Sequence, residues 1–183
     1  MIAIAIMVAA VQAPPTILLA AMQTPPAMLL ATTQVAPATA KARVAIGIWG
    51  RWGAFAERAP RRCYAIARPL SRARQGDAPF ASVGTWPGGA LRNQLHLRLS
   101  RARAGNARVT LSIGERRFDL VAGARDAWAA DDAADRAIVG AMRSGRSMSV
   151  ESVAATGRPF ADVYALSGAA SAIDAAAIAC LRR

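Results

Sequence analysis

The sequence predicts a mostly β fold, a β-sandwich with two short helices, one of them at the C-terminus. Residues 91–99 alternate between apolar and polar side chains, which is typical of a half-buried antiparallel strand. Residues 109–120 predict two more strands joined by a Gly-Glu turn. Turn residues separate about seven such segments, which favours a sandwich. A small barrel with helices is the alternative.

The first 40 residues contain no charged side chain. An apolar run opens the chain, and the paired prolines at 14–15 and 25–26 then interrupt it, so we expect no transmembrane anchor. Small residues precede Lys41, as at a secretory cleavage site, although no basic residue precedes the apolar run. We predict that residues 1–40 are a signal peptide or disordered leader and that 41–183 form a single β-sandwich domain. A later start codon is the alternative.

Short apolar segments flanked by Pro or Gly predict the strands of this domain. The alternation in the third segment places the leucines on one face and His96 on the other, with Asn93 as the single polar residue on the apolar side. The predicted strands are residues 63–67, 80–83, 91–99, 109–113, 118–120, 148–153 and 160–166.

Two segments predict helices. The first begins near Asp131 and Asp132 and ends near Arg143, so acidic and basic side chains lie at the ends that the helix dipole favours. The second spans about 169–181, and its apolar stripe turns Cys180 toward the core. The predicted apolar faces are Ile138, Val139 and Met142 in the first helix, and Ile173, Ala177, Cys180 and Leu181 in the second.

The two cysteines are Cys63 and Cys180. In an exported domain we expect them to form a disulfide, which would tie the C-terminal helix to an early strand. Two unrelated buried thiols are the alternative. Neither cysteine has another Cys or His at metal-ligand spacing, so we expect no metal site.

No arrangement of residues predicts an enzyme. His96 is the single histidine, the serines lack a nucleophile-elbow pattern, and no phosphate-binding glycine motif occurs. Asp131, Asp132 and Asp135 could suggest a metal cluster, but a helix N-terminus explains them better. We therefore expect no catalytic residue and no cofactor.

The basic surface is the best remaining functional feature. The net charge is +12, and every basic residue except Lys41 is arginine. If several arginines share a face, they would bind anionic lipid, lipopolysaccharide or polysaccharide by charge attraction. Nucleic acid is an unlikely partner because no aromatic-interleaved motif occurs. A GC-rich coding bias that supplies solubilising arginines is the alternative. The candidate binding residues are Arg61, Arg62, Arg68, Arg72, Arg74, Arg92, Arg98, Arg116 and Arg117.

The aromatic residues are expected to lie mainly in the core. Trp49, Trp52 and Phe55 precede the first predicted strand, and Trp128 precedes the first predicted helix. Trp86, in a loop rich in Pro and Gly, is the one that we expect to be exposed and available to a partner.

The order and spacing of several short segments carry a family resemblance. They are Trp49-Gly50-x-Trp52-Gly53-Ala54-Phe55, Cys63-Tyr64-Ala65-Ile66-Ala67, Val109-Thr110-Leu111-Ser112-Ile113-Gly114, Phe118-Asp119-Leu120, Ala127-Trp128, Ile138-Val139-x-Ala141-Met142, Met148-Ser149-Val150, Asp162-Val163-Tyr164-Ala165-Leu166-x-Gly168 and Ala179-Cys180. Over roughly residues 46–181, the chain resembles the invasion associated locus B family of alphaproteobacteria.

The resemblance implies a periplasmic or secreted domain with an immunoglobulin-like β-sandwich. The cysteine pair of the family matches Cys63 and Cys180 in position, and the family supplies no established catalytic residue. Its name comes from a role in host-cell invasion, so a host or envelope protein is an expected partner. We expect a non-enzymatic envelope protein that acts by surface binding. The alternative is a structural or stress-related periplasmic protein whose basic surface binds nothing specific.

Overall fold

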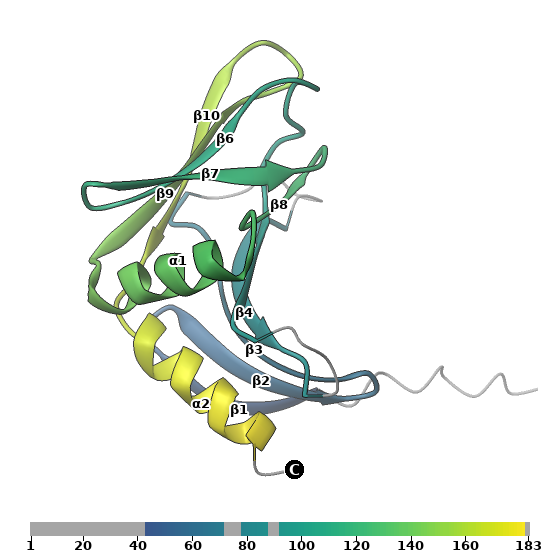
Figure 1. Cartoon of the computed structure of the whole chain (residues 1–183), viewed down its shortest axis with the longest axis vertical. Helices are drawn as coiled ribbons and strands as arrows, with labels where there is room; N and C mark the ends of the chain where they lie inside the picture. The colour runs from purple at the N-terminus through teal and green to yellow at the C-terminus, as the bar shows by residue number, and fades with distance from the viewer. Residues whose placement is uncertain (1–42, 72–77, 88–91, 182–183) are drawn as a thin grey trace, which may run out of the picture. The chain divides into compact units, whose positions relative to one another are not determined.

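The computed structural model describes residues 43–71, 78–87 and 92–181 (Figure 1). The predicted leader, Arg72 and Arg74 lie outside the described residues. The mostly antiparallel β structure with two helices, one C-terminal, confirms the predicted fold class. The elements are β1 (Arg43–Trp49), β2 (Trp52–Arg58), β3 (Arg61–Ala67), β4 (Phe80–Thr85), β5 (Gln94–Arg98), β6 (Val109–Ile113), β7 (Arg116–Ala122), β8 (Asp126–Trp128), α1 (Asp132–Ser144), β9 (Ser147–Val153), β10 (Pro159–Ala165) and α2 (Ala169–Leu181).

The strands are hydrogen-bonded side by side in the order β1-β2-β3-β4-β5-β8-β7-β6-β9-β10. We call β1 to β5 with β8 the first arm, and β7, β6, β9 and β10 the second arm. The arms join where β7 pairs with β8, through Val121–Trp128 and Ala122–Ala127. Figure 1 shows the sheet bending strongly between the arms. The two layers expected of a sandwich are therefore two arms of one continuous antiparallel sheet.

Both helices pack on the same side of the first arm (Figure 1). α2 contacts β1 to β4, and α1 contacts β5, β7 and α2. We call this side of the first arm its inner face and the opposite side its outer face. The largest fully buried side chains include Trp52, Leu95, Leu97, Leu111, Ile138, Met142, Met148, Tyr164 and Ile173. Burial of each such apolar side chain stabilises the fold by about 1.5–3 kcal/mol.

Contacts between residues far apart in sequence hold the β1–β2 hairpin against the end of β10 and the residues that follow it. The Trp52 indole, which is fully buried, donates a 2.8 Å hydrogen bond to the Ala165 carbonyl oxygen. Gly168 has a φ of 88°, and a Cβ atom there would collide with the Trp49 carbonyl oxygen. Glycine is therefore required at this close approach.

The helices begin and end close to their predicted positions. Asp131 is the N-cap of α1, and its carboxylate accepts a hydrogen bond from the Ala134 amide. The predicted apolar face of α1 is buried, as is Cys180 on α2. Leu181 was wrongly placed on the α2 stripe, because it is 74% exposed. Successive helical side chains differ by about 100° in direction, so Leu181 turns away from the sheet that Cys180 faces.

Three strands were not predicted as such: β1, β2 and β8. In β2 the inner face carries Trp52 and the outer face carries Phe55, so no apolar-polar alternation marks the strand. β8 is too short to show a pattern. The predicted strand 91–99 begins instead at Gln94, because Asn93 adopts the left-handed conformation with a φ of 55°.

Candidate functional site on the outer face of the first arm

The predicted disulfide joins Cys63 on β3 to Cys180 on α2, with Cα atoms 5.7 Å apart. It holds the end of α2 against the inner face of the first arm. Side chains alternate along a strand, so the neighbours of Cys63, Arg62 and Tyr64, point to the outer face. Cys63 therefore faces α2 on the inner side of β3, whereas Arg62 and Tyr64 belong to the cluster on its outer side.

A buried carboxylate organises the outer face. Glu57 on β2 is only 4% exposed and lies in register between Arg43 on β1 and Arg62 on β3. Its carboxylate accepts hydrogen bonds from Arg62 Nε at 2.7 Å, Tyr64 Oη at 2.9 Å and Arg43 Nε at 3.3 Å. Three donors on two neighbouring strands therefore compensate the burial of the charge.

The protonation states of this cluster follow from its contacts. The hydrogen bond from Arg62 lowers the pKa of Glu57 to about 2, against the opposing effect of burial. Burial, with the hydrogen bond to Glu57, raises the pKa of Tyr64 to about 12. At neutral pH Glu57 is therefore ionised, and Tyr64 keeps the proton that it donates.

Both arginines of the cluster lie over aromatic rings. The Arg43 guanidinium carbon is 5.6 Å from the centroid of Phe55 and 5.7 Å from that of Tyr64. The corresponding distance from Arg62 to Tyr64 is 5.1 Å. Each arginine uses Nε to bind Glu57, and its terminal amino groups make no hydrogen bond to any described residue. In the described part of the chain, the Arg43 and Arg62 side chains are 57% and 37% exposed, so these amino groups face solvent.

A shallow hollow of about 220 Å³ adjoins the two arginines on the outer face. Its base includes Gly84, and the ring of Trp86 folds back against this glycine, where a Cβ atom would be only 2.9 Å away. Trp86 is half-buried, so the expectation that it would be exposed is met only in part. The hollow is lined by Arg43, Arg62, Cys63, Tyr64, Ile66, Phe80, Ser82, Gly84, Trp86 and His96.

His96 closes the far side of this hollow. Its ring stacks on Trp128, with centroids 5.3 Å apart, and meets the Phe80 ring edge-on at 5.0 Å. Its Nε2 atom lies 2.9 Å from Asp126 Oδ1, and Arg98 also contacts that carboxylate at 3.4 Å. The sequence places His96 correctly on the polar face, but these partners come from strands that only the fold brings together.

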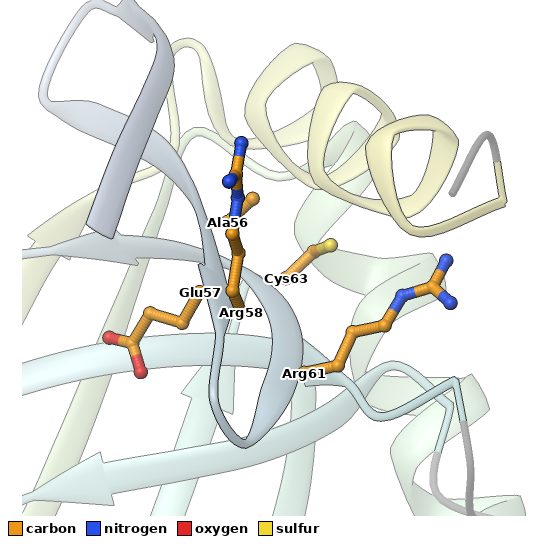
Figure 2. A pocket seen from close by; sticks show the side chains of 5 residues that line it. All are labelled: Ala56, Glu57, Arg58, Arg61 and Cys63. Carbon is orange, nitrogen blue, oxygen red and sulfur yellow. The ribbon is translucent and has the colours of Figure 1, made fainter. Parts of the chain in front are cut away.

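A second hollow, of about 280 Å³, lies beside the β2–β3 hairpin (Figure 2). Figure 2 shows Arg58 and Arg61 extending on the side of α2, whereas Glu57 points away from it. Arg61 donates a 3.1 Å hydrogen bond to the Cys180 carbonyl oxygen, so it stabilises the C-terminal turn of α2. Arg61 and Arg92 also line the neighbouring hollow at this helix end.

The structure separates the arginines that the sequence groups together. Arg62 belongs to the outer-face cluster, and Arg98 pairs with Asp126 at the edge of it. Arg61 and Arg92 lie at the end of α2. Arg116 and Arg117 start β7 on the second arm, and Arg68 is exposed just after β3. The seven candidates that the structure describes therefore lie at several separate places on the domain.

The sequence analysis missed three members of the outer-face cluster, Arg43, Glu57 and Tyr64. The signal that could have found them is the pairing of Glu57 on β2 with Arg43 on β1 and Arg62 on β3, beside the pairing of Phe55 with Tyr64. That pairing becomes visible only when 52–58 is recognised as a strand.

The described part of the chain contains no cluster of three His, Cys, Asp or Glu side chains that could hold a metal ion. Within the same residues, no helix is long and apolar enough to cross a membrane.

Comparison with known proteins places the chain in a family. The profile of the invasion associated locus B (IalB) protein matches residues 54–177. The crystal structure of invasion associated protein b from Bartonella henselae is similar, with a TM-score of 0.52 and 14% sequence identity. The similarity covers 76% of this chain and 99% of that one. At this level of identity the likeness concerns the fold. No match is found among curated proteins.

Proposed function

Because the chain belongs to the invasion associated locus B family, we propose that it is an exported, non-enzymatic binding protein of the cell envelope. Its binding site is the outer-face cluster with the adjoining hollow, and its ligand is an acidic saccharide of the envelope or of a host surface. The Cys63–Cys180 disulfide supports export, because such bonds persist in oxidising compartments. The protein is periplasmic or secreted.

One observation carries the choice of an anionic ligand. Glu57 binds Arg43 and Arg62 through their Nε atoms, so both guanidinium groups are fixed while their terminal amino groups stay available. Arginines held in advance lose little side-chain entropy when they bind a ligand. Their planar fork matches a carboxylate or phosphate, with two parallel hydrogen bonds.

The hollow beside the arginines favours a saccharide as the carrier of that charge. Trp86 and Phe80, which are half-buried, supply flat apolar surfaces, against which the C–H faces of a sugar ring can pack. Ser82 and His96 supply polar atoms for hydroxyl groups. A free inorganic anion would leave these aromatic surfaces unused.

A second candidate function is a structural periplasmic protein whose arginines serve the fold and bind nothing. Arg103 favours it, because its guanidinium donates hydrogen bonds to the carbonyl oxygens of five residues. Those residues are Gly123, Ala104, Gly105, Ala107 and Ala122. All three nitrogens of the Arg103 guanidinium thus bond within the fold, whereas Arg43 uses Nε alone on a described residue.

Titration calorimetry with digalacturonic acid, and with maltose as the neutral comparison, tests the proposal. The wild-type protein should bind the acid and not maltose. Arg43→Gln should weaken binding at least tenfold, because charge-assisted hydrogen bonds contribute about 1.5–3 kcal/mol each. This variant leaves Arg62 and Tyr64 on Glu57, so the domain should still fold.

Arg116→Gln is the matched control, because Arg116 is also exposed and lies 5.1 Å from the ring of Phe118. It removes the same charge and the same type of ring contact on the second arm. Equal loss of affinity in both variants, or no binding by the wild-type protein, would refute the proposed site.

A further inference from the structure

The outer-face hollow continues beyond His96 as a row of neighbouring side chains. Strand register places Ser82 beside His96, His96 beside Trp128, and Trp128 beside Val121. These residues lie on β4, β5, β8 and β7, so the row crosses from the first arm to the second. Directly opposed residues of an antiparallel sheet share one face, so all four belong to the outer face.

The length of this row exceeds what one or two sugars need. Neighbouring strands are about 4.8 Å apart, so the three steps from Ser82 to Val121 span roughly 14 Å. The hollow itself extends from Ser82 back to Arg43 and Arg62. Hollow and row together therefore match an extended chain of several hexose units.

The chemistry of the row continues that of the hollow. Trp128 and His96 form a flat stacked pair, with an interplanar angle of 3°. Val121, which is 57% exposed, extends the apolar surface past the end of the ring stack. Two carboxylates lie next to this path. Asp126 is accompanied by Arg98 and His96, and Asp119, on the same face of β7 as Val121, pairs with Arg108 at 3.9 Å. Among the described residues, each carboxylate beside the row therefore has a basic neighbour.

We propose that the ligand is an extended anionic polysaccharide that lies across the strands. One acidic unit binds Arg43 and Arg62, and later units pack on Trp128 and Val121. This inference rests on the proposed function and adds to it that the ligand is a polymer.

A chain-length series tests the inference. The wild-type protein should bind tetragalacturonic acid at least tenfold more tightly than digalacturonic acid. Val121→Asp places a negative charge on the exposed far end of the row, and it should abolish that gain while leaving the affinity for the disaccharide unchanged. Val153→Asp is the matched control, since Val153 is an exposed strand valine of the second arm. It should keep the full gain.

Trp128→Ala gives a second test at the neighbouring position in the row. It should also remove the gain with chain length and spare the disaccharide, provided that the variant shows a cooperative melting transition. The Val121→Asp result decides the inference if this variant does not fold.

The two proposals fail in different ways. Equal affinity for the two acids, with binding still dependent on Arg43, would overturn the polymer inference and leave the anion site standing. A gain retained in Val121→Asp would overturn it too. No binding of digalacturonic acid at all would refute the proposed function. Binding to phosphatidylglycerol vesicles in place of both saccharides would do the same, because a lipid would then be the partner.

Discussion

At the scale of single residues, Glu57 determines how the candidate site is built. A carboxylate that is 4% exposed is stable only because Arg43, Arg62 and Tyr64 donate to it. The same contacts orient two guanidinium groups over aromatic rings. Buried Glu57 therefore positions Arg43 and Arg62, the two residues that we propose bind the ligand.

The lowered pKa of Glu57 predicts a pH dependence of stability. The folded state favours the ionised carboxylate, so the stabilisation is complete above the ordinary value of 4.5 and is lost as the pH falls toward about 2. The contribution is on the order of 3–3.5 kcal/mol, at about 1.4 kcal/mol for each pKa unit between 4.5 and about 2. Urea unfolding of the wild-type protein should show this loss, and Glu57→Gln should lack it.

The control for this prediction is Glu115→Gln, which changes an exposed glutamate in the turn before β7. It should follow the wild-type pH profile. If Glu57→Gln follows that profile as well, the cluster does not hold the ionised carboxylate as described.

At the scale of elements, the sequence predicted those whose local pattern is unambiguous. α1 carries its own N-cap at Asp131, and β5 and β6 alternate clearly between faces. β2 could not be found in this way, because it has aromatic side chains on both faces. The site was missed for the same reason, since Glu57 lies on that strand.

The site was hard to predict for a second reason, because the sequence does not show which strands pair with one another. His96 was placed on the correct face, but its contact with Asp126 depends on β5 pairing with β8. No local pattern specifies that pairing, because two other strands, β6 and β7, lie between β5 and β8 in the sequence. The arginines were grouped by sequence proximity, which the sheet does not preserve.

The disulfide gives a prediction for the α2 element. The bond closes a loop between cysteines 117 residues apart, which the chain-entropy model values at about 4–5 kcal/mol. Cys63→Ala and Cys180→Ala should therefore lower the melting temperature by similar amounts, and reduction of the wild-type protein should do the same. The double variant is the control, because a reductant should leave its melting temperature unchanged. Strongly different single variants would contradict the pairing.

At the scale of the whole molecule, the charge of the chain is less informative than its distribution. The net charge of +12 suggested one basic binding face, but the described arginines lie on both arms and at the end of α2. Several of them act within the fold, as Arg61 does on the Cys180 carbonyl oxygen. Among the described arginines, Arg43 and Arg62 combine an orientation fixed by Glu57 with further donors beside the outer-face hollow.

Export can be tested on the intact protein from the native cell envelope. Its mass should correspond to a chain that begins near Lys41, and alkylation should add label only after reduction. A chain that retains residues 1–40 and is labelled at both cysteines without reduction would contradict export, and a nucleic acid would then be the first partner to test.

The contacts between the β1–β2 turn and the residues after β10 also bear on the order of folding. Trp52 is buried against Ala165, and Trp49 approaches Gly168, so the first hairpin reaches its native surroundings only when nearly the whole chain is present. Contacts of such long sequence separation form slowly, because loop closure must precede them. Under the export that we propose, the first hairpin would therefore remain without its native packing until synthesis of the chain is nearly complete.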